Sequence, residues 1–379
     1  MWWRHLHPAG LAVILLVGSA LGVLAWTATR TWAAFEEVAV EEFAPEQASA
    51  ALAGRPDSEV AGITLSQEER AALIAAIEAE AGAAAAEAEA LTVVRELAGA
   101  GESSDRLVHP HAFAPRLPDD MFDAFLLIGA DASGALADVI ILVLAPTDGA
   151  TPMMVSLPRD LYLPNQCTRT WNRINTNLGG CRGYATGPEL LALAVQEFTG
   201  VTVDHYARIG FSGFAGLVDA FGGYTVCVPA PTRDANAQLD LPAGCTRADG
   251  ATTLAWVRSR NTERLVGEEW RRVVSSDFAR QARQQDVLLE LASRMLSARS
   301  PASLTRRFEN VAPYMRLDDG WTIREAASYA WRYRRLDLDE VIRLEVPVRN
   351  RRAPTGAAVL VPIRGFNDVL VEAYRPAAR

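Results

Sequence analysis

Short apolar runs separated by polar turns begin at Met121 and set the character of the second half of the chain. Ala124–Gly129, Val139–Leu144 and Met153–Leu157 are nearly uninterrupted apolar stretches, each bounded by turn residues. Such runs are typical of strands that are buried on both faces. They predict an α/β domain.

Downstream segments extend this pattern in alternation. We expect helices at Gly187–Phe198, Phe211–Phe221 and Thr322–Arg334, and strands at Asp204–Ile209, Tyr224–Val228, Val341–Val346 and Ala358–Pro362. Strands that alternate with helices indicate one sheet covered by helices on its faces.

The stretch from Leu254 to Gln285 carries the most distinctive charge pattern. Leu254–Arg260 is predicted to be a strand, which would point Arg258 and Arg260 to the same side. A helix is predicted from Asp277, and the i, i+3 and i+7 spacing places Asp277, Arg280 and Gln284 on one face. Converging guanidinium groups suit a ligand with several phosphate oxygens. A solvated charged surface is the alternative.

Two aspartates flank the loop between the first two strands. Asp131 follows the first strand and Asp138 precedes the second. Carboxylates are ligands that Mg²⁺ accepts together with substrate phosphates. Aspartates are also common turn formers, so the residues alone leave both interpretations open.

Further polar candidates follow the third strand. Arg159, in Pro158-Arg159-Asp160, comes directly after a strand end and is well placed for an oxyanion. Arg173 and Asn175 lie in an NRIN run. His109 and His111 allow a metal site but are better explained as a solvated loop, and His205 is interpreted as structural.

The amino-terminal part has a different composition. Pro8 to Thr29 contains no charged residue, which is enough for a membrane-spanning helix of roughly 20 residues. A cleaved signal peptide is the competing interpretation. Arg4 before the span and acidic residues after it favour a cytoplasmic amino terminus and an extracytoplasmic main part.

An acidic, alanine-rich region follows this span. The net charge is −9 overall, whereas residues 36–105 alone carry 16 acidic residues against 3 arginines. Residues 36–63 are predicted to be an irregular tether. The capping-box pattern at Ser66–Glu69 opens a predicted stalk helix to about Leu97, which suits self-association better than catalysis.

All four cysteines lie in the part expected outside the cell. Cys167, Cys181, Cys227 and Cys245 allow three disulfide pairings. We favour the local pairs Cys167–Cys181 and Cys227–Cys245 over a zinc site, because no C-x-x-C pair or nearby histidine supports zinc.

Several motifs occur together and in order: LLIGADASG, ADVIILV, SLPRD, NRINTNLGG, DHYARIGFSGFAGLVDAFGGYTVCVP, LAWVRSR and DFARQARQQ. With them, residues 123–295 resemble the LytR-CpsA-Psr family of membrane-anchored cell-wall glycopolymer transferases. The resemblance implies a mixed sheet sandwiched by helices, enclosing an apolar pocket for a polyprenyl chain with arginines at its mouth.

The same resemblance assigns roles to individual residues. It implies Mg²⁺ on Asp131 and Asp138, catalytic roles for Arg159, Arg258, Arg260, Arg280, Asp277 and Gln284, and substrate binding by Arg173 and Asn175. Two departures stand out: Ala132-Ser133 replace an arginine common in the first loop, and the loop Asn261–Ser276 is long.

The implied reaction is a phosphotransfer. A glycopolymer-phosphate would move from a polyprenyl-pyrophosphate carrier to a peptidoglycan hydroxyl, releasing polyprenyl phosphate. A non-catalytic lipid-pyrophosphate binding or scaffold protein, and a lipid pyrophosphatase, are the alternatives. Nucleic acid is not an expected partner, since a transcription regulator fits poorly with a membrane anchor. The expected organisation is an anchor at 1–35, a linker and stalk at 36–118, and a catalytic domain at 119–379.

Overall fold

The computed structural model describes residues 39–55, 110–273, 277–297, 312–321, 329 and 337–374. The predicted membrane span, the predicted stalk helix and all of the predicted helix Thr322–Arg334 except Tyr329 lie outside these residues. Within the described ranges, no helix is both long and apolar enough to cross a bilayer.

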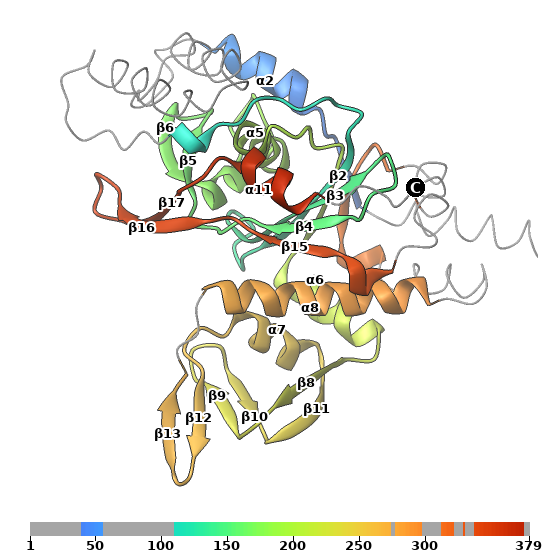
Figure 1. The fold of residues 1–379 in the computed structure, drawn as a ribbon, viewed down its shortest axis with the longest axis vertical. Coiled ribbons are helices and arrows are strands. Elements are labelled where there is room, and N and C mark those ends of the chain that lie inside the picture. Colours follow the sequence, from blue (N-terminus) through green and yellow to red (C-terminus); the bar gives the residue numbers. More distant parts are fainter. Residues whose placement is uncertain are drawn as a thin grey trace, which may run out of the picture.

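A mixed seven-stranded sheet forms the centre of the molecule (Figure 1). The strand order is β1-β14-β7-β2-β3-β4-β15, in which the pairs β1–β14, β7–β2 and β4–β15 are parallel and the other three are antiparallel. Its strands are β1 (Ala39–Glu41), β2 (Phe122–Ala130), β3 (Ala137–Pro146), β4 (Met153–Ser156), β7 (His205–Ile209), β14 (Arg316–Asp318) and β15 (Ile342–Glu345).

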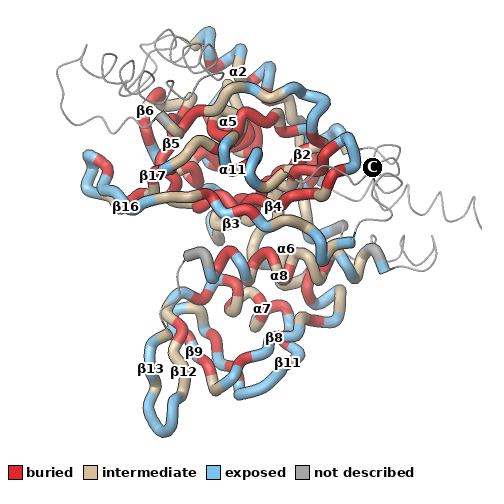
Figure 2. The backbone as a smooth tube through the Cα atoms, viewed as in Figure 1, coloured by how far each residue is buried: buried red, intermediate tan, exposed pale blue. Residues whose placement is uncertain are grey.

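Helices cover both faces of this sheet, as the sequence predicts (Figure 1). The face with α5 (Gly187–Thr199) and α11 (Phe366–Ala373) holds the larger core, which includes Leu126, Leu142 and Phe198. Figure 2 shows the buried backbone concentrated in this layer. α5 starts at a capping box, because Thr186 accepts from the Glu189 backbone while the Glu189 carboxylate accepts from Thr186 N–H.

The opposite face carries α6 (Phe211–Ala220) and the long helix α8 (Asp277–Leu296) (Figure 1). Beneath them α7 (Gly250–Arg258) rests on small sheets built from β8 (Tyr224–Val228), β9 (Thr232–Asp234), β10 (Leu239–Leu241), β11 (Gly244–Ala248), β12 (Glu263–Val266) and β13 (Glu269–Arg272). Further hairpins pair β5 (Tyr162–Asn165) with β6 (Thr170–Arg173), and β16 (Val348–Arg352) with β17 (Ala358–Pro362).

The predicted strand Leu254–Arg260 is wrong. Residues 250–258 form helix α7, whose first turn is capped by Asp249, since its carboxylate accepts from Thr252 N–H at 2.8 Å. Leu254 and Val257 lie three apart and both pack with α6 and α8, so the helical periodicity was present. The segment Asn261–Ser276 is also not a simple loop, because β12 and β13 form an antiparallel hairpin within it.

The predicted tether is likewise wrong for residues 39–55. β1 adds a parallel edge strand beside β14, with Val40 opposite Leu317. Helix α2 (Pro45–Ala53) buries Ala48 and Leu52 against Leu190 and Leu193 of α5. This part of the amino-terminal region therefore belongs to the folded domain.

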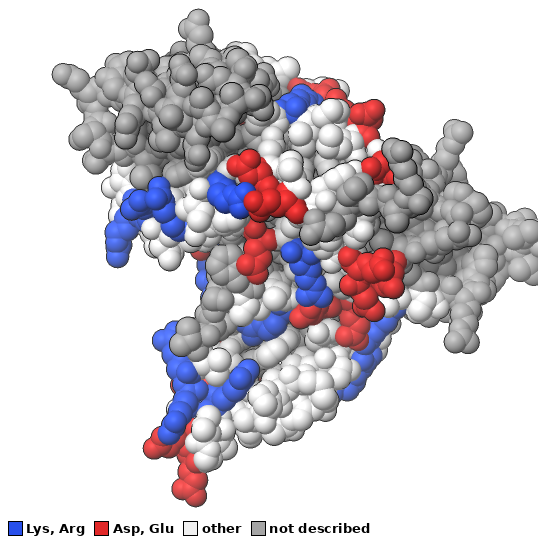
Figure 3. Space-filling view, in the orientation of Figure 1, with Lys and Arg blue, Asp and Glu red and all other residues white. Residues whose placement is uncertain are grey.

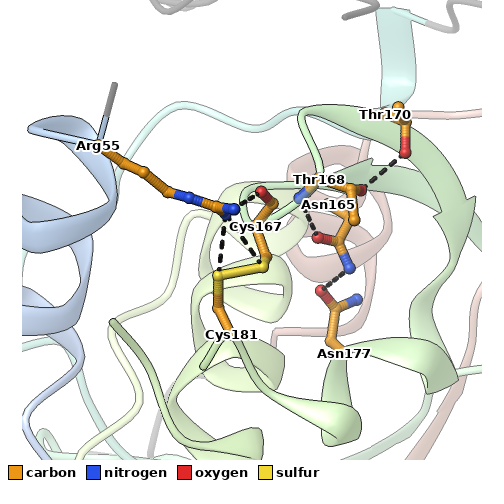
Figure 4. Close-up of a disulfide and its surroundings, with 7 residues drawn as sticks. All are labelled: Arg55, Asn165, Cys167, Thr168, Thr170, Asn177 and Cys181. Atoms are coloured by element: carbon orange, nitrogen blue, oxygen red, sulfur yellow. Dashed lines mark hydrogen bonds between the residues drawn. A yellow bond between two sulfur atoms is a disulfide. The ribbon is translucent and has the colours of Figure 1, made fainter. Parts of the chain in front are cut away.

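Both predicted disulfides are present. Cys167 bonds to Cys181 and Cys227 to Cys245, so the zinc alternative for these cysteines is wrong. Figure 4 shows Arg55, just after α2, donating to the Cys167 carbonyl at 2.6 Å and to the Cys181 sulfur at 3.1 Å. The first disulfide therefore anchors the α2 segment as well as its own loop.

Candidate functional site

A cavity of about 350 Å³ lies between the sheet and the α6–α8 layer. Strands β2, β3 and β7 form one wall, and α6, α7 and α8 form the other. Most of its surface is apolar, with Leu127, Ala207, Phe214, Leu217, Leu254 and Leu288 among the lining residues. A pocket of this character accommodates a hydrocarbon chain.

Polar side chains also line this cavity, and five of the seven are arginines. They are Arg159, Arg208, Arg258, Arg260 and Arg280, together with Gln284 and Asp138. Five guanidinium groups against one carboxylate make this region strongly positive. The combination of an apolar chamber with a cationic region suits an amphiphile with an anionic head group.

Arg258 and Arg260 reach the cavity from the end of α7 and the residues beyond it, not from a strand. The Arg258 guanidinium lies 4.2 Å from the centre of the Phe211 ring, a cation–π distance. Buried Asp234 holds the following turn, because its Oδ2 accepts from Ser259 Oγ and from the backbone N–H groups of Arg260 and Asn261 at 2.7, 2.9 and 2.8 Å.

Helix α8 supplies Arg280 and Gln284, which are 5% and 8% exposed. Their i, i+4 spacing places them on the predicted common face, and both line the cavity. Gln284 donates to the Val257 carbonyl at 3.3 Å, and Gln285 donates to Ser156 Oγ at 2.8 Å. These contacts tie α8 to α7 and to β4. The side chain of Asp277 lies outside the described residues.

A β-bulge directs Asp138 into the site. Gly129 pairs with Val139 and Ala130 with Ala137, so Asp138 has no residue opposite it. Bulges commonly redirect a side chain near a functional site. The Asp138 carboxylate pairs with Arg159, which follows β4 as the sequence predicts.

Asp131 lies in the turn just before this bulge and is not among the residues that line the cavity. Slight burial raises its pKa, but hydrogen bonds from Ser133 Oγ and Leu136 N–H outweigh this and lower the pKa below the usual value. The carboxylate is therefore ionised at neutral pH, as a metal ligand must be.

The two aspartates fit Mg²⁺ in donor type, since both are carboxylates and one faces the cavity. They do not form a complete protein site. Among the described residues, no group of three or more potential ligands gathers in one place. Any such ion would therefore need oxygen ligands from substrate or water.

Arg173 and Asn175 lie apart from the cavity lining. Arg173 pairs with Asp160 at 3.2 Å and donates to the Ala358 carbonyl at 2.7 Å. The Asn175 backbone N–H donates to the Arg159 carbonyl at 3.3 Å. In this structure they support the segment that carries Arg159, and direct substrate binding by either stays a prediction.

The sequence analysis missed Arg208, which lines the cavity from β7. Its guanidinium donates to the Gly134 carbonyl at 2.7 Å, within the loop where Ala132-Ser133 replace the arginine expected from the resemblance. No local pattern marks it, because burial along β7 does not alternate and the successive residues Ala207, Arg208 and Ile209 all line the cavity. His205, on the same strand, is buried away from the cavity with its Nδ1 2.8 Å from Asp318 Oδ1, a structural position.

The fold and the site together define a mixed α/β protein with an apolar cavity into which five arginines converge. The model of the LytR_cpsA_psr family matches residues 100–365, and the chain therefore belongs to this family. The chain superposes on the solved structure of the LytR-Csp2A-Psr enzyme from Actinomyces oris with a TM-score of 0.54 and 24% identity. The match covers 70% of this chain and 97% of that structure. TagV of Bacillus subtilis superposes with a TM-score of 0.53 at 21% identity, covering 68% of this chain and 95% of its own.

Curated relatives carry names from cell-wall synthesis. The chain is 34% identical over 210 residues to the probable cell wall biosynthesis protein LcpB of Corynebacterium glutamicum, covering 55% of this chain and 45% of the relative. It is 25% identical over 201 residues to the polyisoprenyl-teichoic acid–peptidoglycan teichoic acid transferase TagV of Bacillus subtilis. This match covers 51% of this chain and 48% of the relative. The chain thus spans about half the length of the curated relatives it matches.

Proposed function

We propose that this protein is a cell-wall glycopolymer transferase. It takes a glycopolymer-phosphate from a polyprenyl-pyrophosphate carrier and joins it to a hydroxyl of peptidoglycan. Family membership supports transfer in general, and relatives named as teichoic acid transferases support the substrate class. The observation that carries the proposal is the junction of an apolar cavity with five arginines.

Each part of the donor has a counterpart in this site. The apolar walls between β7 and α6 accept the first isoprene units, and the arginines at the cavity accept the pyrophosphate. Phosphoryl transfer depends mainly on positioning and charge stabilisation. Arg159, Arg258, Arg260 and Arg280 would hold the phosphate oxygens as negative charge develops. Gln284 fixes α8 against α7 by donating a hydrogen bond to the Val257 carbonyl.

The reaction forms one O–P bond and breaks another. The acceptor hydroxyl attacks the phosphorus nearer the glycan, and the bond to the bridging oxygen breaks. Polyprenyl phosphate leaves, and the hydroxyl proton passes to this phosphate or to solvent. Asp131 and Asp138 are the residues that would hold Mg²⁺, and this ion would neutralise pyrophosphate oxygens. Arg159, paired with Asp138, would exchange that partner for a substrate oxygen when the donor binds.

The proposed setting is extracytoplasmic, with the chain anchored by Pro8–Thr29. The two disulfides support this placement, because disulfides persist in oxidising compartments and are rare in the cytosol. Self-association through Ser66–Leu97 stays a prediction.

Two alternatives share the same donor site. A lipid pyrophosphatase would use water as the acceptor, and a binding or scaffold protein would capture the lipid without turnover. The cationic cavity and bulged Asp138 are compatible with either, so product analysis must separate them.

The test uses the full chain in detergent, with a polyprenyl-pyrophosphate glycan, Mg²⁺ and peptidoglycan strands. We expect glycan to become covalently attached, and Arg258→Ala and Asp131→Ala to abolish attachment. Phosphate release without attachment would favour the pyrophosphatase, and tight lipid binding without turnover would favour the binding protein. Val371→Ala, at an exposed position of α11, serves as the control variant.

A further inference from the structure

Arg208 lines the cavity from the sheet side, on strand β7, and is half-buried. Arg258 and Arg280 reach the same cavity from the helix layer, which forms the opposite wall. A ligand that lies between the two walls therefore has guanidinium groups on both sides.

A hydrogen bond to the β2–β3 loop, residues 131–136, holds the Arg208 guanidinium in place. Arg208 Nη2 donates to the Gly134 carbonyl at 2.7 Å. Gly134 has a φ of +75°, and a Cβ atom there would lie 3.3 Å from Arg208 Nη2. Glycine adopts this left-handed conformation without strain, and its lack of a side chain leaves room for the guanidinium group.

The β2–β3 loop is otherwise closed on itself. Asp131 N–H donates to the Leu136 carbonyl at 2.8 Å, and Gly134 N–H donates to the Asp131 carbonyl at 3.0 Å. Ser133 Oγ donates to Asp131 Oδ1 at 2.8 Å. Across the described ranges, the loop makes no other hydrogen bond to a residue outside 131–136. Arg208 therefore ties the loop that carries Asp131 to β7.

The acid beside this part of β7 is already engaged. Arg208 is opposite Arg316 of β14, and Arg316 pairs with Glu41 at 2.9 Å. Glu41 also accepts from the Tyr206 hydroxyl at 2.8 Å. Among the residues that the structure describes, no carboxylate forms an ion pair with Arg208.

Arginines at the surface of this protein commonly have acidic neighbours. Figure 3 shows basic and acidic side chains next to each other at several places on one face. Arg364 pairs with Glu372, and Arg343 pairs with Asp286. A half-buried guanidinium group without such a partner keeps a positive charge that an anionic ligand can compensate.

We propose that Arg208 is a donor-binding residue. A guanidinium group has several N–H donors in a planar fork, and the bond to Gly134 uses only part of them. The remaining donors bind the pyrophosphate of the lipid donor from the sheet side, and the bond to Gly134 couples this head group to the loop that carries Asp131. The inference rests on the proposed function, which supplies the ligand.

The test compares two ligands that share a prenyl chain and differ in head group. Calorimetric titration of the full chain in detergent measures binding of geranylgeranyl pyrophosphate and of uncharged geranylgeraniol. Arg208→Gln should weaken pyrophosphate binding about tenfold. It should change geranylgeraniol binding less than about twofold, because the apolar walls stay unchanged. Arg208→Lys should recover part of the loss, since lysine keeps the charge without the planar fork.

Arg316→Gln is the matched control for charge. Arg316 lies opposite Arg208 on the neighbouring strand and does not line the cavity. Its replacement should change the affinity for either ligand less than about twofold. Thermal melting of each variant checks that the fold is retained. A loss of pyrophosphate binding equal to that of Arg208→Gln would overturn the proposal.

A second pair of variants tests the coupling to the loop. Gly134→Ala brings a Cβ atom against Arg208 Nη2 and should weaken pyrophosphate binding about threefold or more. Gly149→Ala is its control, because Gly149 has a similar φ of +83° and a Cβ there meets no atom within 4 Å. Geranylgeranyl pyrophosphate should also slow amide exchange of residues 131–136 in the unmodified protein but not in Arg208→Gln. Equal effects of the two glycine variants, or slowed exchange in Arg208→Gln, would refute the coupling.

The outcomes separate this inference from the proposed function. Unchanged pyrophosphate binding in Arg208→Gln, together with a loss in Arg258→Gln, would overturn the role of Arg208 and leave the donor site intact. Equal losses of both ligands in Arg208→Gln would indicate a structural role and would also overturn the inference. Equal affinities of the unmodified protein for the two ligands would refute the proposed donor site and the inference with it.

Discussion

Asp234 Oδ2 accepts the backbone N–H of Arg260 at 2.9 Å. Asp234 comes from β9, whereas Arg260 follows α7, so this bond fixes the turn that carries two cavity arginines. The same oxygen accepts from Ser259 and Asn261. The direction of the arginines thus depends on a buried acid that does not itself line the cavity.

Replacing this acid should disturb the turn. Asp234→Asn puts an NH₂ group where donors already point, which should cost about 1–3 kcal/mol of unfolding free energy at pH 7. It should also weaken geranylgeranyl pyrophosphate binding through Arg258 and Arg260. Urea denaturation and calorimetric titration measure the two effects, and Asp240→Asn, at an exposed position on β10, is the control.

The contribution of Asp234 to the free energy of unfolding should depend on pH. Burial raises its pKa, but hydrogen bonds from Ser259 and Asn261 outweigh this and lower the pKa. Its stabilisation is therefore present above the unfolded-state pKa of about 3.9 and is lost as pH falls through the lower folded-state pKa. The stability difference between wild type and Asp234→Asn should shrink in acid. A constant difference from pH 7 to pH 3 would contradict this.

Gly129→Ala should disturb the bulge that directs Asp138. A Cβ atom at Gly129 would lie 2.8 Å from the Val139 Cβ. The resulting shift of β3 should cost about 1–3 kcal/mol of stability and reduce transfer activity. Gly54→Ala is the matched control, because a Cβ there comes no nearer than 3.8 Å to another atom and Gly54 does not line the cavity. Equal melting temperatures for the two variants would refute the expected clash.

Filling the cavity should separate lipid binding from pyrophosphate binding. Leu288→Trp adds volume to the α8 wall and should weaken geranylgeranyl pyrophosphate binding about tenfold or more. Binding of inorganic pyrophosphate should change little, because the arginines stay in place. Val371→Trp, on a side chain that is 76% exposed, controls for adding an indole. Equal losses for both ligands would indicate a general disturbance instead.

Removing the first disulfide should lower stability. Cys167 and Cys181 are 14 residues apart, and a loop of this size contributes about 3 kcal/mol in the chain-entropy model. The double variant Cys167→Ser, Cys181→Ser should lose that amount of unfolding free energy. It should also speed amide exchange in α2, since Arg55 contacts this disulfide. Denaturation and amide exchange of residues 45–53 report the two effects. Unchanged exchange in α2 would show that the Arg55 contact does not stabilise it.

Much of the α/β core could be predicted from local pattern. The apolar runs of β2 and β3 and the helix periodicity of α8 are properties of neighbouring residues. The shared face of Arg280 and Gln284 follows from helix geometry alone. Both cysteine pairs are close in sequence, and local pairing was correctly favoured.

Other features depended on contacts between distant segments. β1 is only three residues long, and its place in the sheet comes from pairing with β14, 277 residues later. The approach of Arg208 to Gly134 needs β7 to lie beside β2. Neither relationship leaves a local pattern.

The Arg258–Arg260 segment shows where the two kinds of information meet. Its sequence supplies two guanidinium groups. Helix α8 and the residues after β4 contribute further arginines to the same cavity. Its conformation was decided by packing of Leu254 and Val257 against α6 and α8 and by buried Asp234 from β9. Charge and periodicity are encoded residue by residue, whereas the end of this helix is chosen by burial against elements far away in the chain.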